Sequence, residues 1–175
     1  MLDSAARVVC CDGAADAYRR RTRREPDAVV GDCDSLRGRF AIVARVPEQE
    51  TNDLEKAVRH CRAKGWKNIV VVGATGGRED HSIGNVFRAL DLGVEVVTER
   101  GFFRPVEGGA SFKVRKGCAI SVFAPHHGTK LESTGLQWPL DSLARPDMHN
   151  ATLNRATASR VAIRSSKPVM VFVQW

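Results

Sequence analysis

The sequence lacks long hydrophobic runs. Its longest apolar stretches, at 69–72 and 169–173, are far shorter than the roughly 20 residues that span a bilayer. The first residues, Met1 to Ser4, have neither the basic nor the apolar segment of a secretory leader. We therefore expect a cytoplasmic protein that does not bind membranes.

The cysteines form no metal-binding or disulfide pattern. They are scattered and odd in number, the sequence has no CxxC pair, and no histidine stands at zinc-finger spacing from them. Free cysteine is usually buried in folded proteins. We therefore expect reduced, mostly buried thiols at Cys10, Cys11, Cys33, Cys61 and Cys118.

Aromatic residues are scarce, whereas positive charge is in excess, with a formal net charge of +7. Five arginines cluster between residues 19 and 24, and such a cluster can bind phosphate or nucleic acid. Only 6% of the residues are aromatic, and none interleaves with the cluster to form the stacking platform of a single-strand binder. We interpret the cluster as a solvated helix end and predict no nucleic-acid partner. Phosphate binding and a nucleic-acid-binding module are the alternatives.

The first half of the chain alternates short apolar runs with helical patterns, which is typical of βαβ units and a largely parallel sheet. Apolar residues recur at helical spacing at positions 54, 57, 58 and 61, and again at 83, 86, 87 and 90. Asn52 with Glu55 resembles a capping box, and Asp80 is a candidate N-cap. Strands are expected at 7–11, 28–30, 40–43, 69–72 and 94–97.

Short β-rich segments broken by glycine and proline follow Glu99. They predict strands at 119–123, 161–164 and 169–173, and hence an antiparallel β domain. With Gly101 as the joint, the chain would divide into an α/β domain over residues 1–98 and a β domain over residues 99–175.

Four aspartates, Asp12, Asp32, Asp34 and Asp53, stand directly after predicted strands or at a helix start. The carboxyl ends of parallel strands are where open α/β folds bind ligands, and hard carboxylate oxygens suit Mg²⁺. Asp32 and Asp34 repel each other unless a cation or donors lie between them, so we predict that both bind metal. Asp12, before Gly13, can equally be a turn residue, and Asp53 can equally complement its helix dipole. The pattern predicts a magnesium and phosphate site.

A glycine-rich segment, 73–81, joins a predicted strand to a predicted helix. Gly76 and Gly77 allow the backbone to approach a phosphate closely, and Arg78 can contact phosphate oxygens in a bidentate way. No Gly-Lys-Ser/Thr follows, so the segment is not a P-loop. The alternative is a structural turn in which Arg78 and Asp80 form a local pair.

Taken in order, these segments resemble the motifs of thiamine pyrophosphokinases. The matching segments are VCCDGAA at 9–15, GDCDS at 31–35, TNDLEKA at 51–57, GGREDH at 76–81 and STGLQWPL at 133–140. The resemblance implies a Rossmann-like α/β domain that binds ATP and Mg²⁺, followed by a small antiparallel β-sandwich domain that binds thiamine. It also implies a homodimer with active sites at the subunit interface.

The activity implied by the resemblance is that of a transferase. Such an enzyme moves pyrophosphate from ATP to the primary hydroxyl of thiamine, which gives thiamine diphosphate and AMP. Phosphoryl-type transfer depends mostly on positioning and on charge neutralisation, which carboxylate-bound Mg²⁺ and an arginine can supply.

Residue roles follow from the motif match. The implied metal ligands are Asp32, Asp34 and Asp53. The implied catalytic residues are Asp12, Asp53, Arg78 and Asp80, of which either Asp12 or Asp80 is the base that accepts the hydroxyl proton. The implied contacts to ATP and thiamine are Gly13, Gln49, Asn52, Lys56, Gly76, Gly77, Arg78, Trp138, Thr152 and Asn154.

The second half departs from the family pattern at Leu153, which stands where a hydroxyl contact to thiamine is usual. This departure motivates an alternative function, a catalytically inactive protein that senses a nucleotide or thiamine. Trp138 can stack on the pyrimidine ring of thiamine or fill the core of the β domain. We favour the core, because large aromatic residues dominate small β cores.

Overall fold

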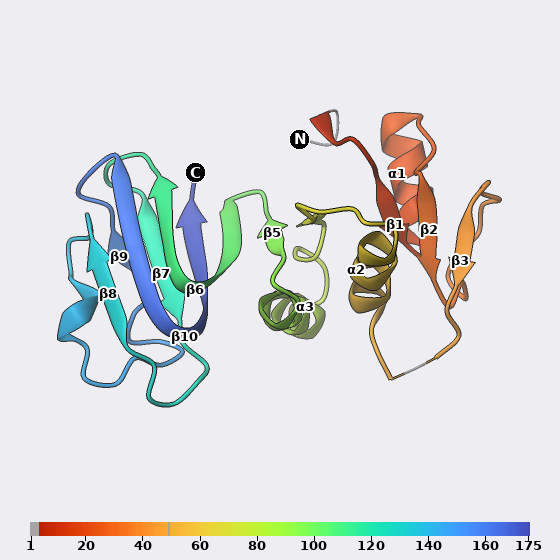
Figure 1. Ribbon diagram of the computed structural model, residues 1–175. Coiled ribbons are helices and arrows are strands. Elements are labelled where there is room, and N and C mark those ends of the chain that lie inside the picture. The colour runs from red at the N-terminus through yellow and green to blue at the C-terminus, as the bar shows by residue number, and fades with distance from the viewer. Residues whose placement is uncertain (1–3, 49) are drawn as a thin grey trace. The chain divides into compact units, whose positions relative to one another are not determined.

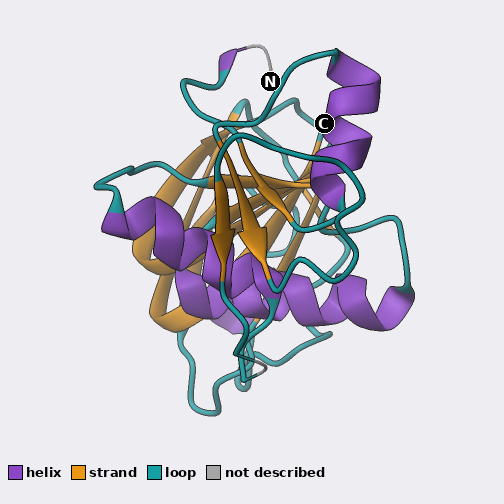
Figure 2. Cartoon of the chain, turned by 90° about the vertical axis from the view of Figure 1, so that its right-hand side faces the viewer, coloured by secondary structure: helices purple, strands orange, loops and turns teal. Residues whose placement is uncertain are grey.

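The computed structural model describes residues 4–48 and 50–175, and the chain packs as two compact units, Met1–Ile69 and Val70–Trp175. Within the described residues, three α-helices accompany two sheets (Figures 1 and 2). The predicted mixed α/β composition is therefore confirmed. In the same residues, no helix has the length and apolar character needed to cross a membrane.

The first unit is built on a three-stranded parallel sheet of order β1-β2-β3. Its strands are β1 (Val9–Cys11), β2 (Ala28–Gly31) and β3 (Val43–Arg45), and its helices are α1 (Ala14–Thr22) and α2 (Asp53–Ala63). All residues of β2 are buried, as expected for the central strand of a parallel sheet. Helix α1 packs against β1, and α2 packs against β1 and β2. The observed β3 begins at the last residue of the strand predicted at 40–43.

The helix ends of the first unit follow from local sequence. The side chain of Asn52 caps α2 by accepting a hydrogen bond of 3.0 Å from the backbone N–H of Glu55, so the predicted cap is confirmed. Helix α1 ends at Arg23 in the left-handed conformation, with arginines in its last turn. The arginine cluster is therefore a helix end, as predicted, and Arg19 lies with its guanidinium 4.5 Å from the ring centre of Phe40.

The second unit contains a seven-stranded mixed sheet of order β4-β5-β6-β10-β7-β9, in which β8 also pairs with β10. Its elements are β4 (Val70–Val72), α3 (Glu79–Leu92), β5 (Glu95–Val97), β6 (Gly101–Lys113), β7 (Ala119–Phe123), β8 (Leu131–Thr134), the 3-10 helix η2 (Leu140–Ser142), β9 (Asn154–Arg155) and β10 (Arg160–Gln174). Its core gathers apolar residues from the antiparallel strands, including Phe112, Ile120, Ile163 and Val171.

Strands β4 and β5 differ from the expectation of one largely parallel sheet. They are parallel to each other, but β5 pairs antiparallel with β6, which joins the parallel pair to the antiparallel strands. The two strands predicted at 161–164 and 169–173 are one long strand, β10, with an irregularity between Ser165 and Val169. A bulge accommodates the extra residues without ending the strand.

Helix α3 begins earlier than predicted. Its N-cap is Arg78, so Asp80 lies in the first turn instead of at the cap. An acidic residue in the first turn complements the positive end of the helix dipole, as a capping side chain also would.

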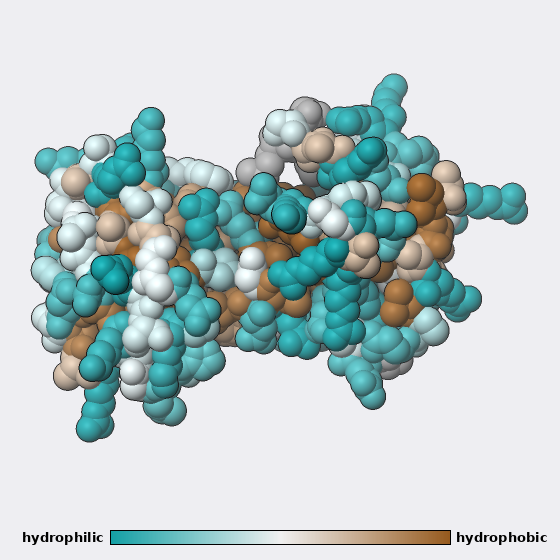
Figure 3. Space-filling view, in the orientation of Figure 1, coloured by the Kyte–Doolittle hydropathy of each residue, from teal (hydrophilic) through white to brown (hydrophobic). Residues whose placement is uncertain are grey.

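The surface seen in Figure 3 is mostly hydrophilic, with hydrophobic side chains at intervals. Large apolar residues exposed in the second unit include Val70, Ile83, Trp138 and Leu153.

Candidate metal and phosphate site

The ends of β1 and β2 bring two aspartates to one edge of the parallel sheet. The register aligns Cys11 with Val30, and the backbone N–H of Asp12 donates to the carbonyl of Val30 at 3.0 Å. Asp12 and Asp32 thus directly follow paired strands at the carboxyl edge, where the sequence predicted a ligand site.

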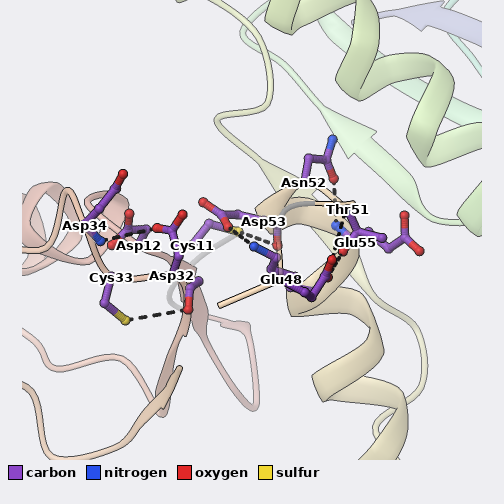
Figure 4. Close-up of polar contacts among 12 residues, drawn as sticks. Cys11, Asp12, Asp32, Cys33, Asp34, Glu48, Thr51, Asn52, Asp53 and Glu55 are labelled. Atoms are coloured by element: carbon purple, nitrogen blue, oxygen red, sulfur yellow. Dashed lines mark hydrogen bonds and ion pairs between the residues drawn. The ribbon is translucent and has the colours of Figure 1, made fainter. Parts of the chain in front are cut away.

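A tight turn adds Asp34 to this pair. Cys33 has a φ of +67°, and the backbone N–H of Asp34 donates to Oδ1 of Asp32 at 3.3 Å. One carboxylate oxygen each of Asp12, Asp32 and Asp34 lies within 4.8 Å of the others (Figure 4). The charge of Asp32 is the main reason why the pKa of Asp34 lies above its usual range. The structure therefore gathers three carboxylates at one edge of the sheet, close enough for their charges to repel.

Asp12 is the buried member of this group, with 5% of its surface exposed. Its Oδ2 atom accepts hydrogen bonds from the hydroxyl of Ser35 at 2.6 Å and from the backbone N–H of Ser35 at 3.2 Å. Among the described residues, its Oδ1 atom has no hydrogen-bond partner. A buried carboxylate oxygen without a donor is costly, and a hard cation is a ligand that would satisfy it. The three carboxylates therefore fit a Mg²⁺ ion.

Asp53 opens α2 next to these three carboxylates. A Cβ atom built on Gly31 would lie 3.4 Å from Oδ1 of Asp53 and 3.0 Å from Cβ of Asp12, which places Asp53 across Gly31 from Asp12. Burial and the charge of Asp32 raise the pKa of Asp53, whereas the ammonium of Lys56 opposes the rise. Lys56 Nζ lies 3.5 Å from Asp53 Oδ1, and its side chain is almost fully buried. A buried lysine paired in this way fixes the carboxylate beside the cluster.

The thiols near this site are neutral. Burial raises the pKa of Cys10 to about 11, and burial together with the charge of Asp53 raises the pKa of Cys11 to about 12. All five cysteines are free, and only Cys11 and Cys33 are not fully buried. The predicted reduced, mostly buried thiols are confirmed.

In the second unit, Arg78 and Asp80 pair with each other at the start of α3. The guanidinium donates from Nη2 to Asp80 Oδ2 at 2.6 Å and from Nε to Oδ1 at 3.1 Å, and both side chains are largely exposed. This contact with Arg78 lowers the pKa of Asp80. Gly76 has a φ of +88°, and a Cβ atom added to Gly76 or Gly77 would meet no other group of the described residues within 4 Å. The segment therefore has free space around the Cβ positions of both glycines.

The predicted thiamine contacts of the second unit lie around β9. Asn154 is buried, and its amide accepts from the backbone N–H of Trp138 at 3.1 Å and donates to the Trp138 carbonyl at 2.6 Å. The Thr152 hydroxyl donates to the carbonyl of His149 at 2.6 Å. Trp138 is 54% exposed, so the interpretation that it fills the core is wrong. It lies in the loop after β8, outside the strands whose inner faces form the core. Gln49 lies outside the described residues.

Family models match both halves of the chain. Residues 1–97 match the thiamin pyrophosphokinase catalytic domain, and residues 101–172 match the thiamin pyrophosphokinase substrate-binding domain. The chain belongs to the thiamin pyrophosphokinase family. The family resemblance and the enzyme class predicted from the sequence are thereby confirmed. The two matches meet between residues 97 and 101, whereas the compact units divide between Ile69 and Val70. The predicted boundary between residues 98 and 99 stays a prediction.

Curated relatives carry the name of this family, and solved structures share the fold. Thiamin pyrophosphokinase 1 of Caenorhabditis elegans is 27% identical over 190 residues, which cover 95% of this chain and 78% of the relative. Thiamine pyrophosphokinase 1 of Oryza sativa is 28% identical, with 81% and 68% covered. The thiamin pyrophosphokinase structure from Candida albicans has a TM-score of 0.74 at 15% identity, covering 98% of this chain and 82% of that one. A Lactobacillus plantarum protein has a TM-score of 0.81 at 20% identity, with 99% and 90% covered.

Two further residues in this thiamin pyrophosphokinase family member touch the acidic cluster but were assigned no role from the sequence. The hydroxyl of Ser35 donates a hydrogen bond to one oxygen of Asp12. The sequence signal for this contact was the position of Ser35 in the GDCDS segment. Arg45 Nε donates to the backbone carbonyl of Asp32 at 3.0 Å. Its place at the end of β3, level with Gly31, is visible only once the strand register is known.

Proposed function

We propose that this chain transfers the pyrophosphoryl group of Mg-ATP to the primary hydroxyl of thiamine, with thiamine diphosphate and AMP as products. The observation that carries the proposal is the gathering of Asp12, Asp32 and Asp34, with an unpartnered buried oxygen on Asp12 among the described residues. Family membership supplies the substrates. Because AMP is released, the hydroxyl oxygen attacks the β-phosphorus, and the bond from that phosphorus to the oxygen bridging the α-phosphate breaks.

The roles of the residues follow from their surroundings. Asp12, Asp32 and Asp34 would hold Mg²⁺, and Asp53, fixed by Lys56, would complete the acidic edge. Bound Mg²⁺ supplies positive charge for the phosphate oxygens on which charge develops. In its open loop, Arg78 would contact phosphate after leaving Asp80, since both side chains are exposed.

The proton acceptor is proposed to be Asp12 or Asp80. In its pair with Arg78, Asp80 has a lowered pKa and is a weaker base than an ordinary aspartate. The oxygen of Asp12 that has no hydrogen-bond partner in the described part of the chain is the one proposed above to bind Mg²⁺, and a carboxylate oxygen bound to a cation is a weak base. Both candidates therefore stay open, and Asp80 becomes the stronger base once Arg78 turns to phosphate.

The finer description of the fold belongs to the same proposal. We propose that the parallel strands form a Rossmann-like domain for ATP, that the antiparallel strands form a β-sandwich for thiamine, and that exposed Trp138 stacks on the thiamine ring. We also propose a homodimer with active sites at the subunit interface, and a cytoplasmic location. The support for these points is the family resemblance and the exposure of Trp138.

The direct test incubates purified protein with ATP, Mg²⁺ and thiamine and resolves the products by chromatography. Thiamine diphosphate and AMP in equal amounts support the proposal. ADP with thiamine monophosphate would instead mean transfer of a single phosphoryl group. Binding of thiamine or ATP by calorimetry with no product over long incubation would favour the sensor.

A further inference from the structure

Arg45 ends β3 directly beside the acidic cluster. It lies level with Gly31 of β2 in the parallel register, and its Nε atom donates to the backbone carbonyl of Asp32 at 3.0 Å. The neighbouring backbone N–H of Val46 donates to the carbonyl of Gly31 at 2.8 Å. Arg45 and the residue after it thus hold two consecutive carbonyls at the point where β2 leaves the sheet.

The carbonyl held by Arg45 belongs to the peptide unit between Asp32 and Cys33. The orientation of that unit depends on φ of Cys33, which is +67°. A residue with a Cβ atom adopts this left-handed conformation only at a free-energy cost. The turn nevertheless needs it, because it directs the backbone N–H of Asp34 back to Asp32 Oδ1 at 3.3 Å. The same turn brings the Asp34 carboxylate to those of Asp12 and Asp32.

The turn therefore carries backbone strain at Cys33 and repulsion between Asp32 and Asp34. The repulsion follows from the geometry, since carboxylate oxygens of the two residues lie within 4.8 Å of each other. Both effects favour opening of the turn when no cation is bound. The hydrogen bond from Arg45 opposes that opening, because it ties the turn to a neighbouring strand of the sheet and not only to other residues of the turn.

We propose that Arg45 is a positioning residue that holds the Asp32–Asp34 turn in its metal-binding conformation. The inference rests on the proposed function, since it assigns Arg45 to the Mg²⁺ site of that function. Arg45 contacts the backbone of one ligand and is not itself a ligand. Its contribution is the hydrogen bond from Nε, and the positive charge of the guanidinium is secondary because the side chain is exposed.

Three substitutions separate the hydrogen bond from the charge. Arg45→Gln places an amide nitrogen donor where Nε lies and removes the charge. Arg45→Met has a similar length without a donor. Arg45→Lys keeps the charge but places a methylene group at the position of Nε. A positioning role predicts that Gln retains function while Met and Lys lose it, whereas an electrostatic role predicts that only Lys retains it.

The measurement is binding of Mn²⁺, a paramagnetic substitute for Mg²⁺, followed by electron paramagnetic resonance on the full chain with a non-hydrolysable ATP analogue. The dissociation constant should rise about 3- to 10-fold in Arg45→Met and Arg45→Lys, the range expected for one net hydrogen bond. It should stay within about twofold of the original in Arg45→Gln. In turnover assays, the Mg²⁺ concentration for half-maximal rate should rise more than kcat falls.

A second substitution tests the link to Cys33. Glycine adopts positive φ without the Cβ penalty, so Cys33→Gly should relieve the strain that Arg45 opposes. Arg45→Met in the Cys33→Gly background should weaken Mn²⁺ binding less than it does with Cys33 present. Equal losses in both backgrounds would contradict the proposed coupling.

Several outcomes overturn the inference. Unchanged Mn²⁺ binding in Arg45→Met would remove the positioning role. Equal losses in Arg45→Gln and Arg45→Met would remove the role of the hydrogen bond, and would assign the effect to charge where Arg45→Lys retains binding. Circular dichroism melts identify any variant that fails to fold. If Arg45→Met or Arg45→Lys fails to fold, Mn²⁺ binding by Arg45→Gln, compared with the original protein, provides the test. If the unsubstituted protein itself binds no Mn²⁺, the proposed function fails, which distinguishes that failure from failure of Arg45 alone.

Discussion

The two units of the chain differ in what lies next to their acidic residues: other carboxylates in the first unit, and an arginine in the second. In the first unit, three carboxylates that follow the ends of two strands meet within 4.8 Å of one another. In the second, Asp80 pairs with Arg78, two residues earlier, on the surface. Sequence neighbours reach such a pair without help from the rest of the fold. Gathering like charges requires the sheet to hold them, and a cation can offset the cost. The tertiary origin of the first cluster is therefore a reason to propose it as the functional site.

The largest expected effect is the loss of one clustered carboxylate. Asp34→Asn should lower the rate of thiamine diphosphate formation by more than roughly 100-fold, since it removes a metal ligand. The melting temperature should not fall, because the substitution also removes repulsion from Asp32. Product chromatography and circular dichroism measure the two effects. Asp91→Asn, at an exposed carboxylate of α3, is the control, and activity near the original level in Asp34→Asn would contradict the metal assignment.

The second-largest expected effect concerns the backbone of the β-rich unit. Gly135 has a φ of +79°, and an added Cβ would collide with the backbone carbonyl of Arg160. Gly135→Ala should therefore lower the free energy of unfolding by about 3 kcal/mol. Gly108, with a φ of +74° and no described neighbour within 4 Å of an added Cβ, is the control, and its substitution should cost about 1 kcal/mol. Urea denaturation compares the two; equal costs would show that the backbone conformation alone matters.

The substitution of Arg78 tests whether its exposed pair with Asp80 has a role besides the local contact. If it binds phosphate as proposed, Arg78→Ala should lower kcat/KM for ATP by at least roughly tenfold, because charge-assisted hydrogen bonds are lost. Stability should change by less than about 0.5 kcal/mol, since the ion pair is exposed. Arg88→Ala, which removes another ion pair of α3, with Asp91, is the matched control. Similar kinetics in both variants would show that Arg78 serves only its local pair.

The smallest effect concerns Asp27, a carboxylate of the first unit with donors around it. The backbone N–H of Val8 and the guanidinium of Arg7 donate to it at 2.8 Å each, and they lower its pKa, the Val8 bond most. Its ionised form therefore stabilises the fold above the unfolded pKa, and this stability is lost as pH falls through the folded pKa. Asp27→Asn should cost about 1 kcal/mol near pH 7.

The pH dependence provides the check on this prediction. Urea unfolding from about pH 7 to about pH 3 should show the difference between the Asp27→Asn variant and the original protein shrinking as acid is added. The pKa of Asp34 is raised, so its ionised form does not favour folding. Protonation of Asp34 in acid should therefore not lower the free energy of unfolding. A difference for Asp27 that persists unchanged in acid would exclude the ion pair and hydrogen bonds as its cause.

Local signals in the sequence predicted the parts of the structure that depend on neighbouring residues. Asn52 caps α2 because capping involves residues three apart. The gathering of Asp12, Asp32 and Asp34 was also predictable, because residues after parallel strands share an edge. Asp53 lies beside this group without being one of its three members, and its role as a metal ligand stays a prediction.

Features that depend on distant pairing were not predictable. The antiparallel pairing of β5 with β6 joins β4 and β5 to the second sheet, and no local pattern specifies it. The exposure of Trp138 depends on the loop that carries it, not on its apolar character. The contact of Arg45 with Asp32 depends on the alignment of β3 with β2.

The side chain of Asn154 pairs with the backbone of Trp138 where a neighbouring strand is absent from the described pairing. Its amide accepts from the N–H and donates to the carbonyl of the same residue, as the backbone of an adjacent antiparallel strand would. The buried amide therefore determines where the indole is presented to solvent. If Trp138 stacks on thiamine as proposed, a substitution at Asn154 should weaken thiamine binding by displacing the indole, even without a contact between the amide and the vitamin.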